Sequence, residues 1–373
     1  ITISKITRID AWFLNKLKNI VATFKRLQSE NLSMELLRQA KQHGFSDLQI
    51  AELQNKTSEN IRKKRMQLGI IPCIKRIDTM AGEFPAQTNY LYLTYNSTRS
   101  DEISFRKKRA IVLGCGPYSV GTSVEFDWCA VGVAASLRQR GVESVMINCN
   151  PETVSTDFDI SDRLYFEELT LERVLDIYDI EKCPLIVSVG GQIPNNLSTK
   201  LHTHKVPILG TTAKSIRRAE HRKLFSALLD ELNISQPRWS HATSYIQARQ
   251  VARKVGYPIL VRPSFVLSGK AMSILDTEKE LISYLENLPL SISEHPLVIS
   301  QFLSGAQEFD YDGVAQDGKI LISAISQHIE GGGVHSGDST MVFPPFSASV
   351  ETLSAIQKYT EKIVKTLKVS GPF

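Results

Sequence analysis

Apolar positions in the first 80 residues recur at helical spacing. The polar residues Asp10, Ser33, Ser46 and Thr57 each stand where they can cap a helix, so the segment is predicted to hold short helices joined by tight turns. The helix after Asp10 is expected to bury one apolar stripe, formed by Phe13, Leu17, Ile20, Phe24 and Leu27. The helix after Thr57 is strongly basic.

Beyond residue 110 short apolar runs alternate with helical stretches. A β-rich run at 89–95 precedes a polar, charged stretch, which indicates a boundary between domains. Alternation of strands and helices is typical of a parallel sheet with crossover helices. The predicted strands are 110–113, 144–148, 185–189 and 206–209, and the predicted helices lie at 131–140, at 171–178 and from 213 onward.

A third region, from about residue 236, has a different pattern. Two strands flank the turn dipeptide Asp317-Gly318, which indicates a hairpin and hence an antiparallel sheet of α+β type. Helices are expected at 245–255 and 278–285, and strands at 259–262, 271–275 and 297–302. An amphipathic helix runs toward the end of the sequence.

Basic residues are concentrated in the N-terminal segment, and this adds an alternative interpretation of its helices. The chain of 373 residues carries a formal charge of +5, while residues 1–80 hold 15 Lys and Arg against 7 Asp and Glu. The basic helix therefore permits one alternative, a DNA-binding helix-turn-helix at 45–70. A charge run is more often a solvated helix face, and no cluster suited to base-edge contacts stands out. We therefore expect no nucleic-acid partner.

Other features narrow the class of protein. Five scattered cysteines without a C-x-x-C pair favour reduced thiols over a zinc site or disulfides. No apolar run approaches the roughly 18 residues of a membrane span, so no membrane partner is expected. The chain starts at Ile1 and stops after Phe373 within apolar sequence, so we expect it to be a fragment.

Polar and glycine-rich segments follow three strands of the predicted parallel sheet. Residues 114–121 follow a strand and open a helix, where they could bind an anion or simply allow close packing. A dinucleotide fingerprint would need glycine at Ser119, so nicotinamide and flavin cofactors are not expected. Residues 148–157 and 190–192 end neighbouring strands, and we expect these loops to converge at the sheet edge where ligands bind.

The third region offers groups for a phosphorylated ligand. Arg262 ends a strand and can hold a phosphate through two N–H groups, while Glu308 could bind ribose hydroxyls. Residues 331–339 supply bare amides, an imidazole and hydroxyls within nine positions, which suits a triphosphate.

Together these segments closely resemble the large, synthetase part of carbamoyl phosphate synthetase, in its second half and in a eukaryotic-like form. The matching segments are 112–130, 148–168, 190–197, 261–272 and 328–339. The resemblance implies a helical oligomerisation domain (1–85), a linker (86–109), a parallel-sheet pre-ATP-grasp domain (110–215) and an α+β ATP-grasp domain (216–373) that is incomplete at its C-terminus.

The resemblance also assigns roles to residues. It implies catalytic roles for Arg262 and His335, with supporting roles for His328 and Glu330. It implies a nucleotide site formed by Arg262, Gln301, Leu303, Glu308, Gly333, Val334, His335 and Ser336. Gln301 replaces a His or Lys, and the run that ends at Gly333 is richer in glycine than in relatives. Magnesium ligands are expected beyond Phe373, so this chain should hold none and should be an incomplete catalyst.

The implied activity is ATP-dependent phosphorylation of carbamate to carbamoyl phosphate, for pyrimidine, arginine or urea synthesis. The implied cofactors are ATP, magnesium and potassium. The partners would be carbamate, the first synthetase half and a glutaminase domain or subunit, with oligomerisation through the N-terminal helices. The location would be the cytoplasm or the mitochondrial matrix. The nearest alternative is another ATP-grasp carboxylate–amine ligase or carboxylase.

Overall fold

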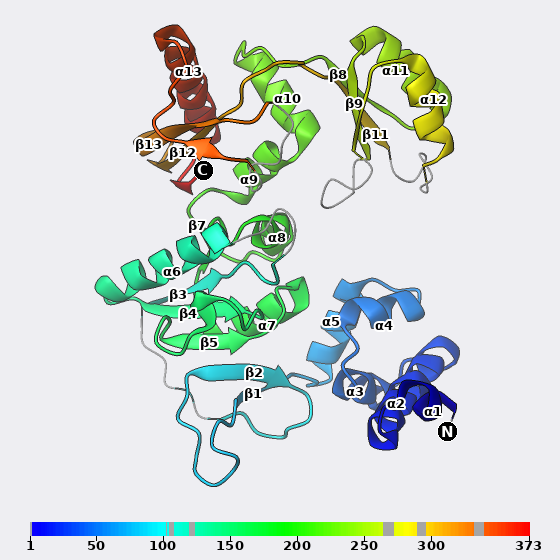
Figure 1. Cartoon of the computed structure of the whole chain (residues 1–373). Helices are drawn as coiled ribbons and strands as arrows, with labels where there is room; N and C mark the ends of the chain where they lie inside the picture. Colours follow the sequence, from blue (N-terminus) through cyan, green and yellow to red (C-terminus); the bar gives the residue numbers. More distant parts are fainter. Residues whose placement is uncertain are drawn as a thin grey trace. The chain divides into compact units, whose positions relative to one another are not determined.

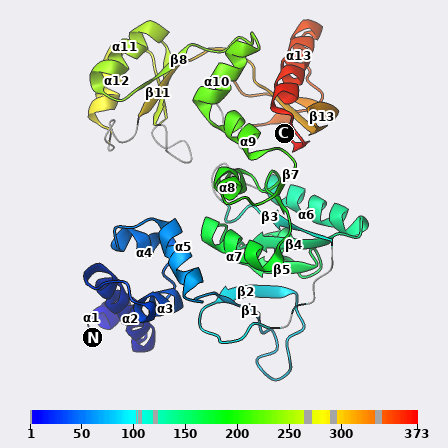
Figure 2. The same cartoon turned by 180° about the vertical axis from the view of Figure 1, so that it is seen from behind.

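The chain is described by a computed structural model that covers residues 2–101, 103, 108–118, 124–263, 272–288, 296–331 and 339–373. It divides into two compact units, which are described separately. Residues 1–116 and 127–207 form the first unit, and residues 117–126 and 208–373 form the second. Figures 1 and 2 show their elements from opposite sides.

Five helices open the first unit, and the caps predicted for them are confirmed. Asp10, Ser33, Ser46 and Thr57 each accept a backbone hydrogen bond at the start of a helix, and Ser46 forms a full capping box. The helices are α1 (Thr2–Thr7), α2 (Ala11–Ser29), α3 (Met34–Gln42), α4 (Asp47–Leu53) and α5 (Ser58–Gln67).

The buried stripe predicted for α2 is wrong along most of its length. Leu27 is fully buried, but Phe13 and Leu17 are 58% and 54% exposed, and Ile20 and Phe24 also remain exposed. The core of this segment includes Leu27 from the end of α2, together with apolar residues of α3, α4 and α5. Helical periodicity identifies the apolar face of a helix, but tertiary packing decides how much of that face is covered.

A seven-stranded sheet follows, in the order β1-β2-β5-β4-β3-β6-β7. Strands β2, β5, β4, β3 and β6 pair in parallel, as predicted, and β1 runs antiparallel to β2. The strands are β1 (Cys73–Arg76), β2 (Tyr90–Thr94), β3 (Arg109–Leu113), β4 (Glu143–Asn148), β5 (Arg163–Phe166), β6 (Leu185–Ile186) and β7 (Ile208–Leu209).

This sheet extends beyond its predicted limits. The stretch 86–109, expected as a linker, contains β2, and the segment expected to be helical contains β1. Strand β5 was not predicted, and β6 is shorter than the run 185–189. Composition marks polar stretches between elements, whereas strand pairing depends on partners far apart in sequence. The helices are α6 (Val124–Gln139), α7 (Leu171–Glu181) and α8 (Gln192–Thr203), with a short 3₁₀ turn η1 (Val154–Thr156).

The basic helix α5 faces acidic residues of the same unit. Arg65 is fully buried and donates hydrogen bonds to Asp47 at 2.9 Å and to Asp176 of α7 at 2.8 Å. Burial alone would lower the pKa of the Arg65 guanidinium, but the charges of Asp176 and Asp47 outweigh burial and raise it. Arg62 pairs with Asp176 and Asp179. Two of the charges that suggested a DNA-binding helix therefore serve internal packing.

Close backbone packing at the edge of the sheet gives a test of the fold. A Cβ on Gly190 would lie 2.5 Å from the carbonyl oxygens of both Gly114 and Leu113. We expect Gly190→Ala to destabilise the first unit by about 1–3 kcal/mol, because backbone atoms would have to move. In contrast, Gly132→Ala lies in open space on α6 and should stabilise by up to about 1 kcal/mol. Urea unfolding measures both, and equal stability of the two variants would contradict this packing.

The second unit holds two antiparallel four-stranded sheets, and the hairpin predicted at Asp317-Gly318 is confirmed within one of them. Asp317 and Gly318 both have positive φ, as a two-residue hairpin turn requires. The sheet orders are β10-β9-β11-β8 and β14-β13-β12-β15. The strands are β8 (Trp239–Ala242), β9 (Ile259–Pro263), β10 (Ser273–Leu275), β11 (Leu297–Gln301), β12 (Phe309–Gln316), β13 (Lys319–His328), β14 (Met341–Val342) and β15 (Gly371–Pro372).

Each sheet of the second unit packs against helices. Helices α11 and α12 cover one face of the first sheet, as Figure 1 shows, and they share an apolar core with β8, β9, β10 and β11. Helices α10 and α13 share a second core with β12. The helices are α9 (Ala213–Glu220), α10 (Arg222–Glu231), α11 (Tyr245–Val255), α12 (Glu278–Glu286) and α13 (Val350–Leu367).

Candidate functional site

Side-chain alternation along β9 places Arg262 on the face of its sheet opposite to the apolar core. Ile259 and Val261 are buried in the core with α11 and α12. Because neighbouring residues of a strand point to opposite faces, Arg262 projects from the other face. Strand β11 pairs Val298 with Arg262, so these two side chains share that face.

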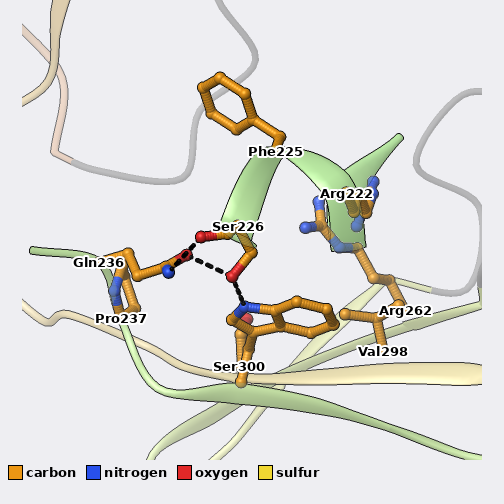
Figure 3. Close-up of a pocket in the computed structure, with 9 residues that line it drawn as sticks. Arg222, Phe225, Ser226, Gln236, Pro237, Arg262, Val298 and Ser300 are labelled. Atoms are coloured by element: carbon orange, nitrogen blue, oxygen red, sulfur yellow. Dashed lines mark hydrogen bonds between the residues drawn. The ribbon is translucent and has the colours of Figure 1, made fainter. Parts of the chain in front are cut away.

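A cavity of about 220 Å³ lies on this second face, between the sheet and α10. Its walls from the sheet are Trp239, Arg262, Val298 and Ser300, and its walls from α10 and the following segment are Arg222, Phe225, Ser226, Gln236 and Pro237. Figure 3 shows the Arg262 side chain extending toward the helix that carries Arg222.

The cavity contains two cationic side chains. Burial, together with the positive charge of Arg222, lowers the pKa of Arg262 to about 10. Arg222 stays exposed as a whole, but desolvation around its guanidinium lowers its pKa as well. Both groups remain protonated at neutral pH, so the cavity has a positive potential.

Neither arginine has an acidic partner in the part of the chain that the structure describes. The Nε atom of Arg262 is buried and lacks a hydrogen-bond partner there. By comparison, Arg249 and Arg253 of α11 both pair with Glu278. Two close cations with a buried, unused N–H group form a site for an anion with several oxygen atoms, such as a phosphate group.

The other predicted nucleotide contacts lie outside this cavity. Gln301 pairs with Ile259, at the opposite end of β9 from Arg262. The backbone N–H of Gln301 donates a hydrogen bond to the backbone carbonyl of Arg238. Leu303 follows β11 and is 49% exposed. Of the predicted nucleotide contacts that the structure describes, only Arg262 lines the cavity.

Glu308, predicted to bind the nucleotide, lies beside His328, for which a supporting role was predicted. The Nδ1 atom of the buried His328 lies 3.4 Å from a carboxylate oxygen of Glu308, and its Nε2 atom lies 3.1 Å from Asp310. The imidazole thus stands between two carboxylates of the β12 region. Glu308 keeps an accessible side chain, with 40% of its surface exposed.

Glu330 connects the two ends of the predicted nucleotide loop. Its carboxylate accepts hydrogen bonds from Ser339 Oγ at 2.8 Å and from the backbone N–H of Thr340 at 2.7 Å. These bonds, led by that from Ser339, lower the pKa of Glu330 to about 2. Four residues predicted for the site itself, Gly333, Val334, His335 and Ser336, lie outside the described residues.

The structure adds Arg222, Ser226 and Trp239 to the residues found from sequence. Arg222 and Ser226 are one turn apart on α10 and so share a helix face. Their spacing in the sequence was sufficient to predict this. The sequence did not show which strand that face would meet. Trp239 comes to the cavity only because β8 pairs with β11.

Hydrogen bonds join the segment 148–157 to the glycine turn that follows β3. Asn148 is fully buried, accepts hydrogen bonds from the N–H groups of Gly116 and Cys149, and donates to Ser155. A Cβ on Gly114 would lie 2.7 Å from the Asn148 side chain. These contacts favour the close-packing interpretation of the glycines in this turn, because the polar atoms of Asn148 are already used within the fold.

Three family models match consecutive parts of the chain. They are the carbamoyl-phosphate synthetase large chain oligomerisation domain (residues 1–69), the carbamoyl phosphate synthase preATP-grasp domain (106–218) and the carbamoyl-phosphate synthase L chain ATP binding domain (221–372). These matches define a protein with an ATP-grasp type ATP-binding domain. The chain belongs to the carbamoyl phosphate synthase large-chain family.

Two relatives and one solved structure agree with this family. The chain is 51% identical to the arginine-specific carbamoyl phosphate synthase large chain of Cutaneotrichosporon cutaneum, over 99% of this chain and 32% of that protein. It is 49% identical to the mitochondrial, ammonia-type carbamoyl-phosphate synthase of Rattus norvegicus, over 100% of this chain and 25% of that protein. The chain therefore spans a third or less of the length of these relatives.

The structural match concerns the fold alone. The biotin carboxylase domain of Hydrogenobacter thermophilus 2-oxoglutarate carboxylase, solved with MgADP and bicarbonate, superposes with a TM-score of 0.54 at 14% identity. The match covers 71% of this chain and 59% of that one. It confirms the predicted succession of a parallel-sheet domain and an α+β domain of ATP-grasp type.

Proposed function

We propose that this chain binds ATP for the synthesis of carbamoyl phosphate, and that Arg262 and Arg222 hold the nucleotide phosphates. The observation that carries the proposal is the pair of guanidinium groups without an acidic partner among the described residues. Phosphoryl transfer depends on positioning and on neutralising the charge of phosphate oxygens, and two fixed guanidinium groups supply both.

The remaining predicted contacts extend the site around this pair. Glu308, supported by His328, would bind the ribose hydroxyls, while Gln301 and Leu303 would lie along the base. Glu330 would keep the ends of the loop together, so that Gly333, Val334, His335 and Ser336 can act on the phosphates. These roles, and a catalytic role for His335, follow from the resemblance and are supported by the contact of Glu308 with His328 and by that of Glu330 with Ser339.

Magnesium would neutralise the phosphates further when the nucleotide is bound. Among the described residues no group of three or more His, Cys, Asp and Glu side chains could hold a metal ion. We therefore assign the metal no ligands in this part of the chain and derive no step through it. The potassium ion likewise stays a prediction without assigned ligands.

The wider setting of the activity is proposed from the relatives. The phosphorylated substrate would be carbamate, with a first synthetase half and a glutaminase domain or subunit as partners. The helical segment matches an oligomerisation domain, which supports an oligomer formed through it. No helix among the described residues combines the length and hydrophobicity needed to cross a bilayer. The cytoplasm and the mitochondrial matrix remain the two proposed locations, and the domain limits 1–85, 110–215 and 216–373 remain proposals as well.

The reverse of the proposed reaction separates this function from those of other ATP-grasp ligases. The full-length protein should transfer the phosphoryl group of carbamoyl phosphate to the terminal phosphate of ADP, which yields ATP and carbamate. Coupled formation of ATP is the measurement, and omission of carbamoyl phosphate is the control. Activity with an acyl phosphate of another carboxylic acid, but none with carbamoyl phosphate, would favour the alternative ligase or carboxylase.

A further inference from the structure

The hydroxyl of Ser226 joins α10 to the sheet beneath it. It accepts a hydrogen bond from Nε1 of Trp239 at 2.8 Å and donates one to Oε1 of Gln236, also at 2.8 Å. Figure 3 shows these bonds side by side at the wall of the cavity. The hydroxyl of Ser226 thus acts both as a hydrogen-bond donor and as an acceptor within the protein.

Gln236 completes this connection. Its amide nitrogen donates to the backbone carbonyl of Ser226 at 3.1 Å and to the carboxylate of Asp230 at 2.8 Å. Four hydrogen bonds therefore fix the middle of α10 to the segment 236–239, which leads directly into β8. Since hydrogen bonds in a connected network support one another, α10 should have one preferred rotation about its axis.

This rotation decides where Arg222 points. Residues 222 and 226 lie one helical turn apart and on the same side of α10. Trp239, which holds Ser226, pairs with Ser300 of β11, and Arg262 pairs with Val298 of the same strand. Trp239, which anchors α10, and Arg262 are therefore both paired with β11, at positions of that strand that are two residues apart.

The two arginines need such a restraint because they repel each other. The charge of Arg222 contributes to the lowered pKa of Arg262, which shows that the two guanidinium groups interact unfavourably. No acidic side chain among the described residues forms an ion pair with either of them. Without an anchor, Arg222 could turn away into solvent, where its charge is better hydrated.

We infer that Ser226 and Trp239 are positioning residues, which hold α10 so that Arg222 and Arg262 reach the same phosphate group. This inference rests on the proposed function. Neither residue would touch the transferred phosphoryl group, and both act through the location of Arg222.

Substitution of Ser226 in the full-length protein tests the anchor. Ser226→Ala should weaken ATP binding about three- to tenfold, the equivalent of one lost hydrogen bond, and leave adenosine binding unchanged. Ser226→Thr keeps the hydroxyl and should restore most of the affinity. Trp239→Phe keeps an aromatic wall but removes the indole N–H, so it should resemble Ser226→Ala. The matched control is Trp128→Phe, because Trp128 is 77% exposed and lies in the other unit.

A double-mutant cycle with Arg222 separates positioning from general destabilisation. In an Arg222→Ala background, Ser226→Ala should change ATP affinity less than about twofold, since its effect passes through Arg222. Calorimetry gives the affinities, and circular dichroism checks folding; if Ser226→Ala does not fold, Trp239→Phe enters the cycle instead. A full effect of the substitution in the Arg222→Ala background would overturn the inference.

The same measurements distinguish this inference from the proposed function. If Arg222→Ala and Arg262→Ala both leave ATP affinity unchanged, the proposed phosphate site is wrong. If the arginine variants bind ATP weakly while Ser226→Ala and Trp239→Phe bind it normally, only the positioning role is wrong.

Discussion

Replacing Arg262 by alanine in the full-length protein should weaken ATP binding roughly ten- to 150-fold. The substitution removes charge-assisted hydrogen bonds worth about 1.5–3 kcal/mol, including one from an N–H group that is buried without a partner in the described structure. Arg262→Lys should give an intermediate affinity, because lysine keeps the charge but lacks the planar pair of donors. Isothermal titration calorimetry with ATP measures all three proteins.

The control for this substitution is Arg253→Ala. Arg253 lies on α11 of the same unit, on the side of the sheet away from the cavity, and it already pairs with Glu278. Its removal lowers the net charge by the same amount but should leave ATP affinity unchanged. Equal losses in the two alanine variants would mean that general electrostatic attraction, rather than the cavity, binds the nucleotide.

Removing Arg65 should destabilise the first unit by about 3–5 kcal/mol, since loss of this buried cation leaves an excess of buried negative charge. Asp47 and Asp176 are 3% exposed each and share the guanidinium of Arg65, so Arg65→Ala would leave Asp47 with Lys41 alone and Asp176 with Arg62 alone as cationic partners. The effect should concentrate where α5 meets α7. Hydrogen exchange of the amides in these two helices should therefore accelerate strongly in Arg65→Ala.

An exposed ion pair on α2 provides the control for Arg65. Arg26 pairs with Glu30, and both side chains are about half accessible, at 40% and 46%. Arg26→Ala should leave hydrogen exchange in α5 and α7 at the wild-type rate, because surface ion pairs contribute little. Wild-type exchange rates in Arg65→Ala would show that the ion pairs of Arg65 do not hold α5 against α7.

Local signals in the sequence predicted the elements of this fold well. The caps at Ser33, Ser46 and Thr57 and the turn at Asp317-Gly318 depend on residues that are close in sequence, so their chemistry is visible without a structure. The exposed face of α2 and the strands β1 and β5 were missed. All three depend on what packs or pairs with them, and that is decided by distant parts of the chain.

The same distinction applies to the candidate site. Arg262 was found because it ends a strand beside a glycine-rich turn. Arg222 was missed because its role depends on how α10 lies over the sheet, and that arrangement depends on the hydrogen bond between Ser226 and Trp239. Glu308 was found from its chemistry and from the resemblance, and the structure places His328 against it. Sequence patterns thus suggest the chemical groups, while the fold decides which of them meet.

The most direct test of the phosphate site compares ATP with adenosine in the wild-type protein and in the double variant Arg222→Ala/Arg262→Ala. The two ligands share base and sugar and differ only in the phosphates. The wild-type protein should bind ATP far more tightly than adenosine, and the double variant should bind the two with similar, weak affinity, as measured by calorimetry. If the double variant kept the wild-type preference for ATP, the two arginines could not be the groups that hold the phosphates.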